Sequence, residues 1–422
     1  MGQSLGAPHH VRDLLRDLDP RSARHRRQIP SGPRRGLRLE SEPLRRRFGG
    51  PPRSDVTAPR DGEGLKRLED FTVFDIETIR VLLRGGSVID WHRLNVDGPE
   101  EVDEFLRVQE FRVGEQADQA RLEQIQSEAI AYLRRNFDFP VPKPVERASI
   151  DELMALAGGK GHRQVCACSI LKIMHIIHHL EGRELMFVLP LSDQEIFHLV
   201  EEKVYRVIGG MLAKGFPIIE FLGGRKNKDS LYTKLLSKQQ TIAAQIYDKL
   251  RFRIVTRTAD DIFPILNYLT RKLFPFNYVI PGETTNTIFH FRDYCERQPA
   301  LRRLLGRLQT DLDVENVLTP SQNEFSASDF KIVHFVVDLP VRLSAELLEN
   351  APPSAWSLGP VIFVLTEIQI IDRETESRNE LGESSHAQYK ERQKQAVMRR
   401  LKLGLEGERR GRRATRPPPD KL

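Results

Sequence analysis

A carboxylate interrupts an otherwise apolar stretch near the end of the chain, residues 361–371 (VIFVLTEIQII). The stretch is rich in β-branched residues and predicts a buried strand. Side chains alternate along a strand, so Glu367 and Gln369 share one face and the isoleucines beside them share the other. Burying a carboxylate without a partner costs several kcal/mol. Either this is an edge strand with a solvated face, or Glu367 has a chemical role.

A basic segment that could bind phosphate lies at residues 223–238 (GGRKNKDSLYTKLLSK). It predicts a helix, with Lys226, Ser230 and Lys234 before and along its first turns. Backbone amides at a helix N-terminus attract anions, and nearby lysines strengthen that attraction. Lysines on a helix are also commonly no more than a solvated face, so this segment alone leaves both interpretations open.

Two further pairs of residues accompany predicted strands. Asp248 stands just before the stretch 249–257, which alternates as a strand and carries Arg253 on one side. Phe330 stands four residues before His334, at the start of a predicted strand. Each pair is a weak signal by itself.

The elements that must position these residues change in type along the chain. Residues 66–216 are predicted to be mostly helical, with amphipathic stretches at 115–137, 169–182 and 191–215. In the last stretch, Ser192 and Glu195 have the spacing of a capping box. From residue 217 on, strands are expected at 217–223, 249–257, 331–339 and 361–371, and helices at 228–238, 259–274 and 373–401. The last of these stretches is one helix or two, depending on whether Gly382 interrupts it.

Three histidines, His175, His178 and His179, lie in one of the expected helices. The acidic residue that follows a histidine directly in metal-dependent phosphohydrolases is missing, so we expect histidines on the helix surface. The three cysteines of the chain form no disulfide framework and indicate a reducing cytoplasm. No apolar run is long enough to span a bilayer, which argues against a membrane partner.

The positive charge of the chain is concentrated at its two ends. Fourteen arginines and six acidic residues give residues 1–60 a balance of +8, and nine basic against three acidic residues give residues 398–422 a balance of +6. Because the whole chain carries +6, residues 61–397 carry −8. The ends are rich in Pro, Gly and Arg and are expected to be disordered. Such basic tails either contact RNA or the ribosome, or are solvated extensions.

Taken together, the polar segments resemble the synthetase domain of the RelA/SpoT family, which belongs to the nucleotidyltransferase superfamily. That domain has a Lys-x-x-x-Ser-x-x-x-Lys segment, a Tyr-Asp pair with an Arg five residues after the Asp, and an aromatic residue four before a His. It ends with Glu-x-Gln-Ile, Glu-x-Gly and His-x-x-Tyr-Lys, the most specific part. The matching residues are Lys226, Ser230, Lys234, Tyr247, Asp248, Arg253, Phe330, His334, Glu367, Gln369, Ile370, Glu380, Gly382, His386, Tyr389 and Lys390.

The resemblance implies an α+β fold with a mixed sheet flanked by helices. It also implies Mg²⁺-dependent transfer of a pyrophosphoryl group from ATP to the 3′-hydroxyl of a guanosine nucleotide, which is synthesis of guanosine tetra- or pentaphosphate. By resemblance, Asp248 and Glu367 are the catalytic residues and the Mg²⁺ ligands, with Glu367 as base or second ligand. The implied nucleotide-binding residues are Lys226, Ser230, Lys234 and Arg253 at the ATP phosphates, Phe330 stacked on the acceptor base, His334 and Gln369.

The chain departs from the family mainly on the acceptor side. Residues 328–330 are Ser-Asp-Phe where the family has Asn-Gly-Tyr, and residues 371–372 are Ile-Asp where it has Arg-Thr. About thirty residues are inserted after FRDYCERQ. These changes keep two alternatives open, which are transfer to an RNA acceptor and a catalytically silent nucleotide-binding or interaction module.

The chain is therefore divided into four parts. We expect a disordered basic tail (1–65), a mostly helical region (66–194), a RelA/SpoT-like nucleotidyltransferase domain (195–397) and a second disordered basic tail (398–422). The expected partners are ATP and a guanosine nucleotide, with RNA or ribosome contact through the tails, and the oligomeric state stays open.

Overall fold

The structure, a computed structural model, describes residues 37–38, 64–87, 89–237, 249–308, 318–319, 325–327, 329–381 and 385–414. Asp248 and nearly all of the expected first tail therefore lie outside the described residues. Within these ranges, no helix is long and apolar enough to cross a bilayer.

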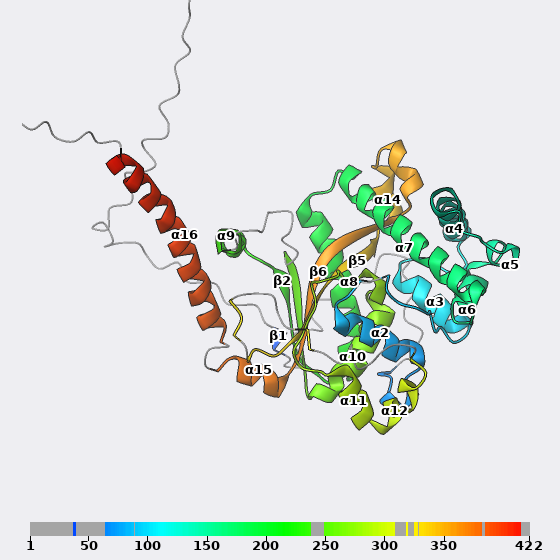
Figure 1. The fold of residues 1–422 in the computed structure, drawn as a ribbon, viewed down its shortest axis with the longest axis horizontal. Coiled ribbons are helices and arrows are strands. Elements are labelled where there is room, and N and C mark those ends of the chain that lie inside the picture. Colours follow the sequence, from blue (N-terminus) through cyan, green and yellow to red (C-terminus); the bar gives the residue numbers. More distant parts are fainter. Residues whose placement is uncertain are drawn as a thin grey trace, which may run out of the picture. The chain divides into compact units, whose positions relative to one another are not determined.

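The described strands form one mixed sheet in the order β1-β2-β3-β6-β5-β4. Figure 1 labels β1, β2, β5 and β6 of this sheet. They are β1 (Leu37–Arg38), β2 (Ile218–Arg225), β3 (Leu250–Thr256), β4 (Thr285–Asn286), β5 (Val333–Arg342) and β6 (Val361–Asp372). β3 and β6 are parallel, and the other neighbouring strands are antiparallel. The four strands expected from the alternation are present, and the predicted α+β fold with a mixed sheet is confirmed.

One face of the sheet, here called the back face, is apolar and packed against helices. Its buried side chains include Phe252, Ile254, Phe335, Ile368 and Ile370. Helix α8 (Asp193–Ala213) lies against it, with the ring of Tyr205 6.1 Å from that of Phe252. Helix α10 (Ile262–Lys272) is followed by Phe274, whose ring contacts Phe335 at 5.4 Å. α8 starts at the capping box expected from the sequence, which fixes where the chain enters the sheet layer.

A mostly helical region lies between β1 and β2 along the chain. It contains α2 (Val73–Arg84), α3 (Pro99–Val108), α4 (Gln116–Phe137), α5 (Lys143–Glu146), α6 (Ile150–Ala157) and α7 (His162–Val188). Arg342 at the end of β5 joins it to the sheet by donating to Asp118 of α4 at 2.7 and 3.0 Å. α7 lies on β6 at Gly182, where a Cβ atom would be 2.4 Å from a ring carbon of Phe363. Glycine therefore permits this close approach.

The histidines of α7 correct one expectation. His175 and His178 are 9% and 5% exposed, so they are not helix-surface residues. The ring of His178 lies 4.7 Å from that of Phe111 and 5.3 Å from that of Phe363. Both rings lie on the side of α7 that packs against β6 and the other helices, whereas the opposite side of the helix, with Leu180 at 63% exposure, faces solvent.

The remaining described helices follow β2 along the chain. They are α9 (Lys228–Ser237), α11 (Phe291–Arg297), α12 (Pro299–Leu305), α14 (Ala345–Glu349), α15 (Arg373–Asn379) and α16 (His386–Ala414). The last expected helix is thus two helices, with Gly382 outside the described residues. α16 also continues past the boundary expected at residue 397. Its first half packs on α9, where Arg400 Nη1 donates to the carbonyl of Leu236 at 3.0 Å, and this contact favours continuation of the helix.

Candidate active site on the sheet

The face opposite the back face, here called the front face, carries charged residues from three neighbouring strands. The register places Arg253 of β3 opposite Gln369 of β6, and Gln369 opposite His334 of β5. In the next row, Arg251 is opposite Glu367. Residues directly opposite each other on neighbouring strands point to the same face. These five side chains therefore share the front face.

Glu367 is held in a buried hydrogen-bonded row. It is 5% exposed, and β6 lies between β3 and β5, so the edge-strand alternative is wrong. Gln369 Nε2 donates to Glu367 Oε1 at 2.6 Å, and Arg253 Nε donates to Gln369 Oε1 at 2.9 Å. His334 Nε2 lies 3.3 Å from Glu367 Oε1. These contacts orient the carboxylate and offset part of its desolvation cost.

Arg253 is surrounded by carboxylates. Its Nη1 lies 3.5 Å from Glu376 of α15. Burial, and next the neighbouring Arg251, lower the pKa of Arg253, while Glu376 and Glu380 oppose that change. Burial raises the pKa of Glu376, Arg253 acts against that, and Glu220 raises it further. The guanidinium groups of Arg251 and Arg253 thus face four carboxylates, those of Glu220, Glu367, Glu376 and Glu380. Because the acidic groups outnumber the basic ones, this site suits a metal–nucleotide complex better than a free polyphosphate.

The other residues predicted to bind ATP, apart from Arg253, lie after β2 and on α9. Lys226 follows β2, and its N–H donates to the carbonyl of Lys249 at 2.9 Å, next to the start of β3. Asn227 Oδ1 accepts from the N–H of Ser230 at 2.8 Å and so caps the first turn of α9. Ser230 and Lys234 are one turn apart and half-buried. The cap therefore fixes the start of the helix that carries the basic segment.

Phe330, the residue predicted to stack on a base, is half-buried in the segment before β5. Its carbonyl accepts from Thr287 Oγ1 at 3.2 Å. The next residue, Lys331, exchanges two hydrogen bonds of 3.1 and 2.7 Å with the side chain of Asn379 on α15. The segment carrying the aromatic ring is thus tied to the helix that carries Glu376.

The structure joins four of the predicted residues directly, and it adds others that sequence reasoning missed. Glu367, Gln369, Arg253 and His334 form one connected row. The missed acidic residues are Glu220 of β2 and Glu376. Glu376 lies in RETESRNE, directly after the strand of Glu367, and this charge-rich segment was a usable signal. Also missed was a cluster of Asp338, His179 and Arg183 on the front face. His179 and Arg183 are spaced i, i+4 on α7.

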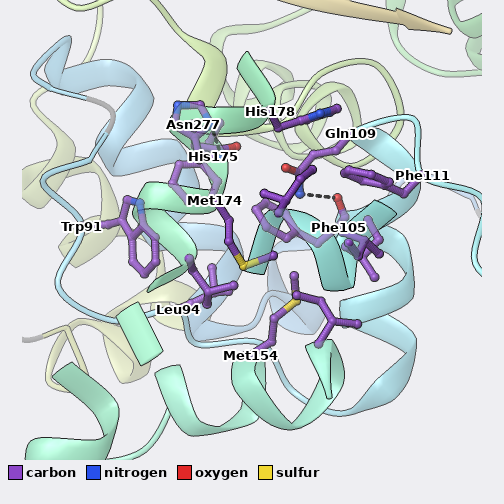
Figure 2. A pocket seen from close by; sticks show the side chains of 16 residues that line it. Trp91, Leu94, Phe105, Gln109, Phe111, Met154, Met174, His175, His178 and Asn277 are labelled. Carbon is purple, nitrogen blue, oxygen red and sulfur yellow. Dashed lines mark hydrogen bonds between the residues drawn. The ribbon is translucent and has the colours of Figure 1, made fainter. Parts of the chain in front are cut away.

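A separate cavity lies among the helices of the N-terminal region (Figure 2). Its volume is about 40 Å³, and most of its lining is apolar. Figure 2 shows Asn277, His175 and His178 along one wall, opposite Met154. Among the described residues, neither ring nitrogen of His178 has a hydrogen-bond partner. The space suits a few water molecules and is too small for a nucleotide.

The donor atoms present on the front face are compatible with Mg²⁺. Glu367 offers the oxygen donor that Mg²⁺ prefers. The other expected ligand, Asp248, lies outside the described ranges. In the part of the chain that the structure describes, no group of three or more His, Cys, Asp or Glu could hold a metal ion. Mg²⁺ usually takes one or two carboxylates together with water and substrate phosphates, so the donors fit a site that a nucleotide completes.

Comparison with protein-family models finds no match, and comparison with curated proteins finds none. Solved structures do match. Small alarmone synthetase 1 from Bacillus subtilis is 18% identical, with 52% of this chain and 93% of that chain covered and a TM-score of 0.26. Small alarmone synthetase 2 from the same organism is 15% identical, with 53% and 97% covered and a TM-score of 0.25. A GTP pyrophosphokinase family protein from Streptococcus pneumoniae is 18% identical, with 51% and 87% covered and a TM-score of 0.24.

Similarity at this level transfers neither fold nor activity to this chain. The side chains of the front face must therefore carry any functional conclusion.

Proposed function

We propose that the front face is the active site of a RelA/SpoT-like pyrophosphokinase, which transfers a pyrophosphoryl group from ATP to the 3′-hydroxyl of a guanosine nucleotide. The observation that supports this most is the buried carboxylate of Glu367 on a central strand, with Gln369 and His334 at its Oε1 atom. A buried acid that is held by polar neighbours on an interior strand is costly, and catalysis is a reason to keep it.

In the proposed reaction, the 3′-hydroxyl oxygen attacks the β-phosphorus of ATP. The bond from that phosphorus to the oxygen bridging it to the α-phosphorus breaks, and AMP leaves. The hydroxyl proton passes to Glu367 as general base. Gln369 and His334 keep the carboxylate oriented, so little rearrangement is needed when the proton moves.

The other residues would bind and position the nucleotides. Lys226 and Lys234, with Ser230 assisting, would face the ATP phosphates from α9, and Arg253 would face them from β3. Phe330 would stack on the acceptor base, with His334 and Gln369 on the same side. Mg²⁺ would be held by Asp248 and the nucleotide phosphates, with Glu367 as second ligand in place of its role as base, and would neutralise phosphate charge.

A nucleotide-binding module without catalysis is the second candidate. Two observations favour it. Glu367 Oε1 already accepts a 2.6 Å hydrogen bond from Gln369. In addition, Ile371, buried at 1% exposure, stands where the family has a cation. The first would make the carboxylate a weaker base and the second removes a cation, so both would slow transfer.

The deciding experiment incubates the full-length protein with γ-labelled ATP, Mg²⁺ and one acceptor at a time, using GDP, GTP or RNA. We expect label to move to GDP or GTP, with one AMP released per transfer. Label on RNA alone would overturn the assignment of the acceptor. Binding of both nucleotides without transfer would overturn the enzymatic proposal and support the silent module.

A further inference from the structure

A second charged cluster lies on the front face beside the proposed active site. Asp338 of β5 is 2% exposed. Its Oδ2 atom lies 2.7 Å from His179 Nε2 and 3.4 Å from Arg183 Nη1, and its Oδ1 atom lies 3.5 Å from the same Nη1. The buried carboxylate of Asp338 therefore contacts two side chains of α7 and fixes their orientation.

The two outer members of this cluster reach solvent. The side chains of His179 and Arg183 are 27% and 31% exposed, against 3% for Asp338. Within the described residues, the structure pairs Arg183 with Asp338 alone, through Nη1. The remaining N–H groups of this guanidinium are thus available to an incoming anion, and Asp338 holds the group in place for it.

The register puts this cluster next to Glu367. Val336 is opposite Glu367, and Asp338 is opposite Leu365, on the same two strands. Two residues along a strand correspond to about 7 Å. On this face Asp338 and Glu367 are diagonal neighbours, and the buried Val336 and the half-buried Leu365 occupy the other two positions of the same group of four. A nucleotide bound over Glu367 would therefore have its phosphate chain within reach of Arg183.

We propose that Arg183, supported by His179, binds a terminal phosphate of a nucleoside 5′-polyphosphate held over Glu367, and so determines how many phosphates the site prefers. This inference rests on the proposed function. A planar guanidinium suits a phosphate because its N–H groups can pair with two oxygens at once. Asp338 positions Arg183 and would not touch the nucleotide.

The test measures binding by calorimetry with the full-length protein, Mg²⁺ and one nucleotide at a time. The nucleotides are the mono-, di- and triphosphates of guanosine and of adenosine, which separate the acceptor from the donor. We expect Arg183→Gln to weaken binding of one triphosphate roughly tenfold or more and of its monophosphate little, since only the triphosphate carries the terminal phosphate that Arg183 would contact. Arg183→Lys should retain part of the preference. The control Arg206→Gln, at an exposed site on α8, should change nothing.

Unchanged affinities in Arg183→Gln, or an equal loss for all nucleotides of a series, would overturn the inference. If Arg183→Gln fails to fold, an Arg183→Lys variant with unaltered preference for the triphosphate overturns it as well. Wild-type protein that binds triphosphates through Arg183 but transfers nothing would contradict the proposed function and leave this inference standing. Wild-type protein that binds none of the nucleotides would contradict both.

Discussion

Two buried histidines on α7 predict that the fold loses stability in mild acid. Burial is the main cause that lowers the pKa of His175 to about 3, and His179 and His178 add to it. Burial likewise lowers the pKa of His178 to about 3, followed by the charge of Arg121. Asn277 Nδ2 lies 3.0 Å from Nδ1 of His175, which suits a neutral ring accepting that hydrogen bond. Both histidines are therefore neutral in the folded protein at pH 7.

The sign and size of the effect follow from the difference between the folded and unfolded pKa values. An unfolded histidine has a pKa near 6.5 and is protonated below that pH, whereas the folded one stays neutral down to about pH 3. The free energy of unfolding is therefore highest above about pH 6.5 and falls as the pH decreases toward 3. At pH 5 each histidine lowers the free energy of unfolding by about 2 kcal/mol. Together they remove about 4 kcal/mol, a large part of the stability of a typical domain.

Urea unfolding at pH 7.5 and at pH 5 measures this difference. His178→Phe removes one of the two groups, and the cavity of about 40 Å³ beside it gives room for the larger ring. We expect that variant to lose roughly half of the pH dependence. His198→Gln, at an exposed position on α8, is the control and should keep all of it. A wild-type midpoint that does not move between the two pH values, or an unchanged slope in His178→Phe, would refute the reasoning.

Three other features give direct predictions. Gly182→Ala should destabilise the protein by about 3 kcal/mol, because the new Cβ atom would overlap the ring of Phe363. Asp118→Asn should cost about 1.5–3 kcal/mol, because it removes the nearer counter-charge of the Arg342 guanidinium, which is 15% exposed, and leaves only Glu115 at 3.8 Å. Removal of residues 1–60, with their balance of +8, should weaken RNA binding and reduce its dependence on salt.

Each of these predictions has a control or a contradicting result. Gly209→Ala lies on α8 with no atom within 4 Å of the new Cβ atom, and it should be neutral or slightly stabilising. If Gly182→Ala unfolds at the same urea concentration as Gly209→Ala, the close contact between α7 and β6 is wrong. An Asp118→Asn variant as stable as wild type would contradict the ion pair. Equal RNA affinity and salt slope with and without residues 1–60 would make the tail a solvated extension.

The strands and the face carrying Glu367 could be predicted because alternation is a local property. The residues between 361 and 371 determine by themselves which side chains share a face. Alternation also places Arg253 on the polar face of its strand, which points away from the apolar face. Neither pattern predicts that Gln369 bridges Glu367 and Arg253, because that depends on the register of strands more than 100 residues apart.

The parts of the site that the sequence left unrecognised depend on contacts between distant segments. Asp338 meets His179 across 159 positions, and no spacing rule connects them. The buried histidines were misjudged for a related reason. α7 has apolar residues around most of its circumference, so its sequence does not reveal which side faces the sheet. Asp248 lies outside the described residues, and its role stays a prediction.

The measurement that tests the central claim most directly is the rate of pyrophosphoryl transfer in Glu367→Gln. This change removes the charge and keeps the shape, and the new amide oxygen can still accept from Gln369. We predict that kcat falls by about 10²–10⁴-fold while nucleotide affinity and the urea midpoint stay near wild type. Glu374→Gln, at an exposed site on the neighbouring α15, should keep the full rate. A Glu367→Gln enzyme that transfers at the wild-type rate, or wild-type protein that binds ATP and a guanosine nucleotide without transfer, would contradict the account.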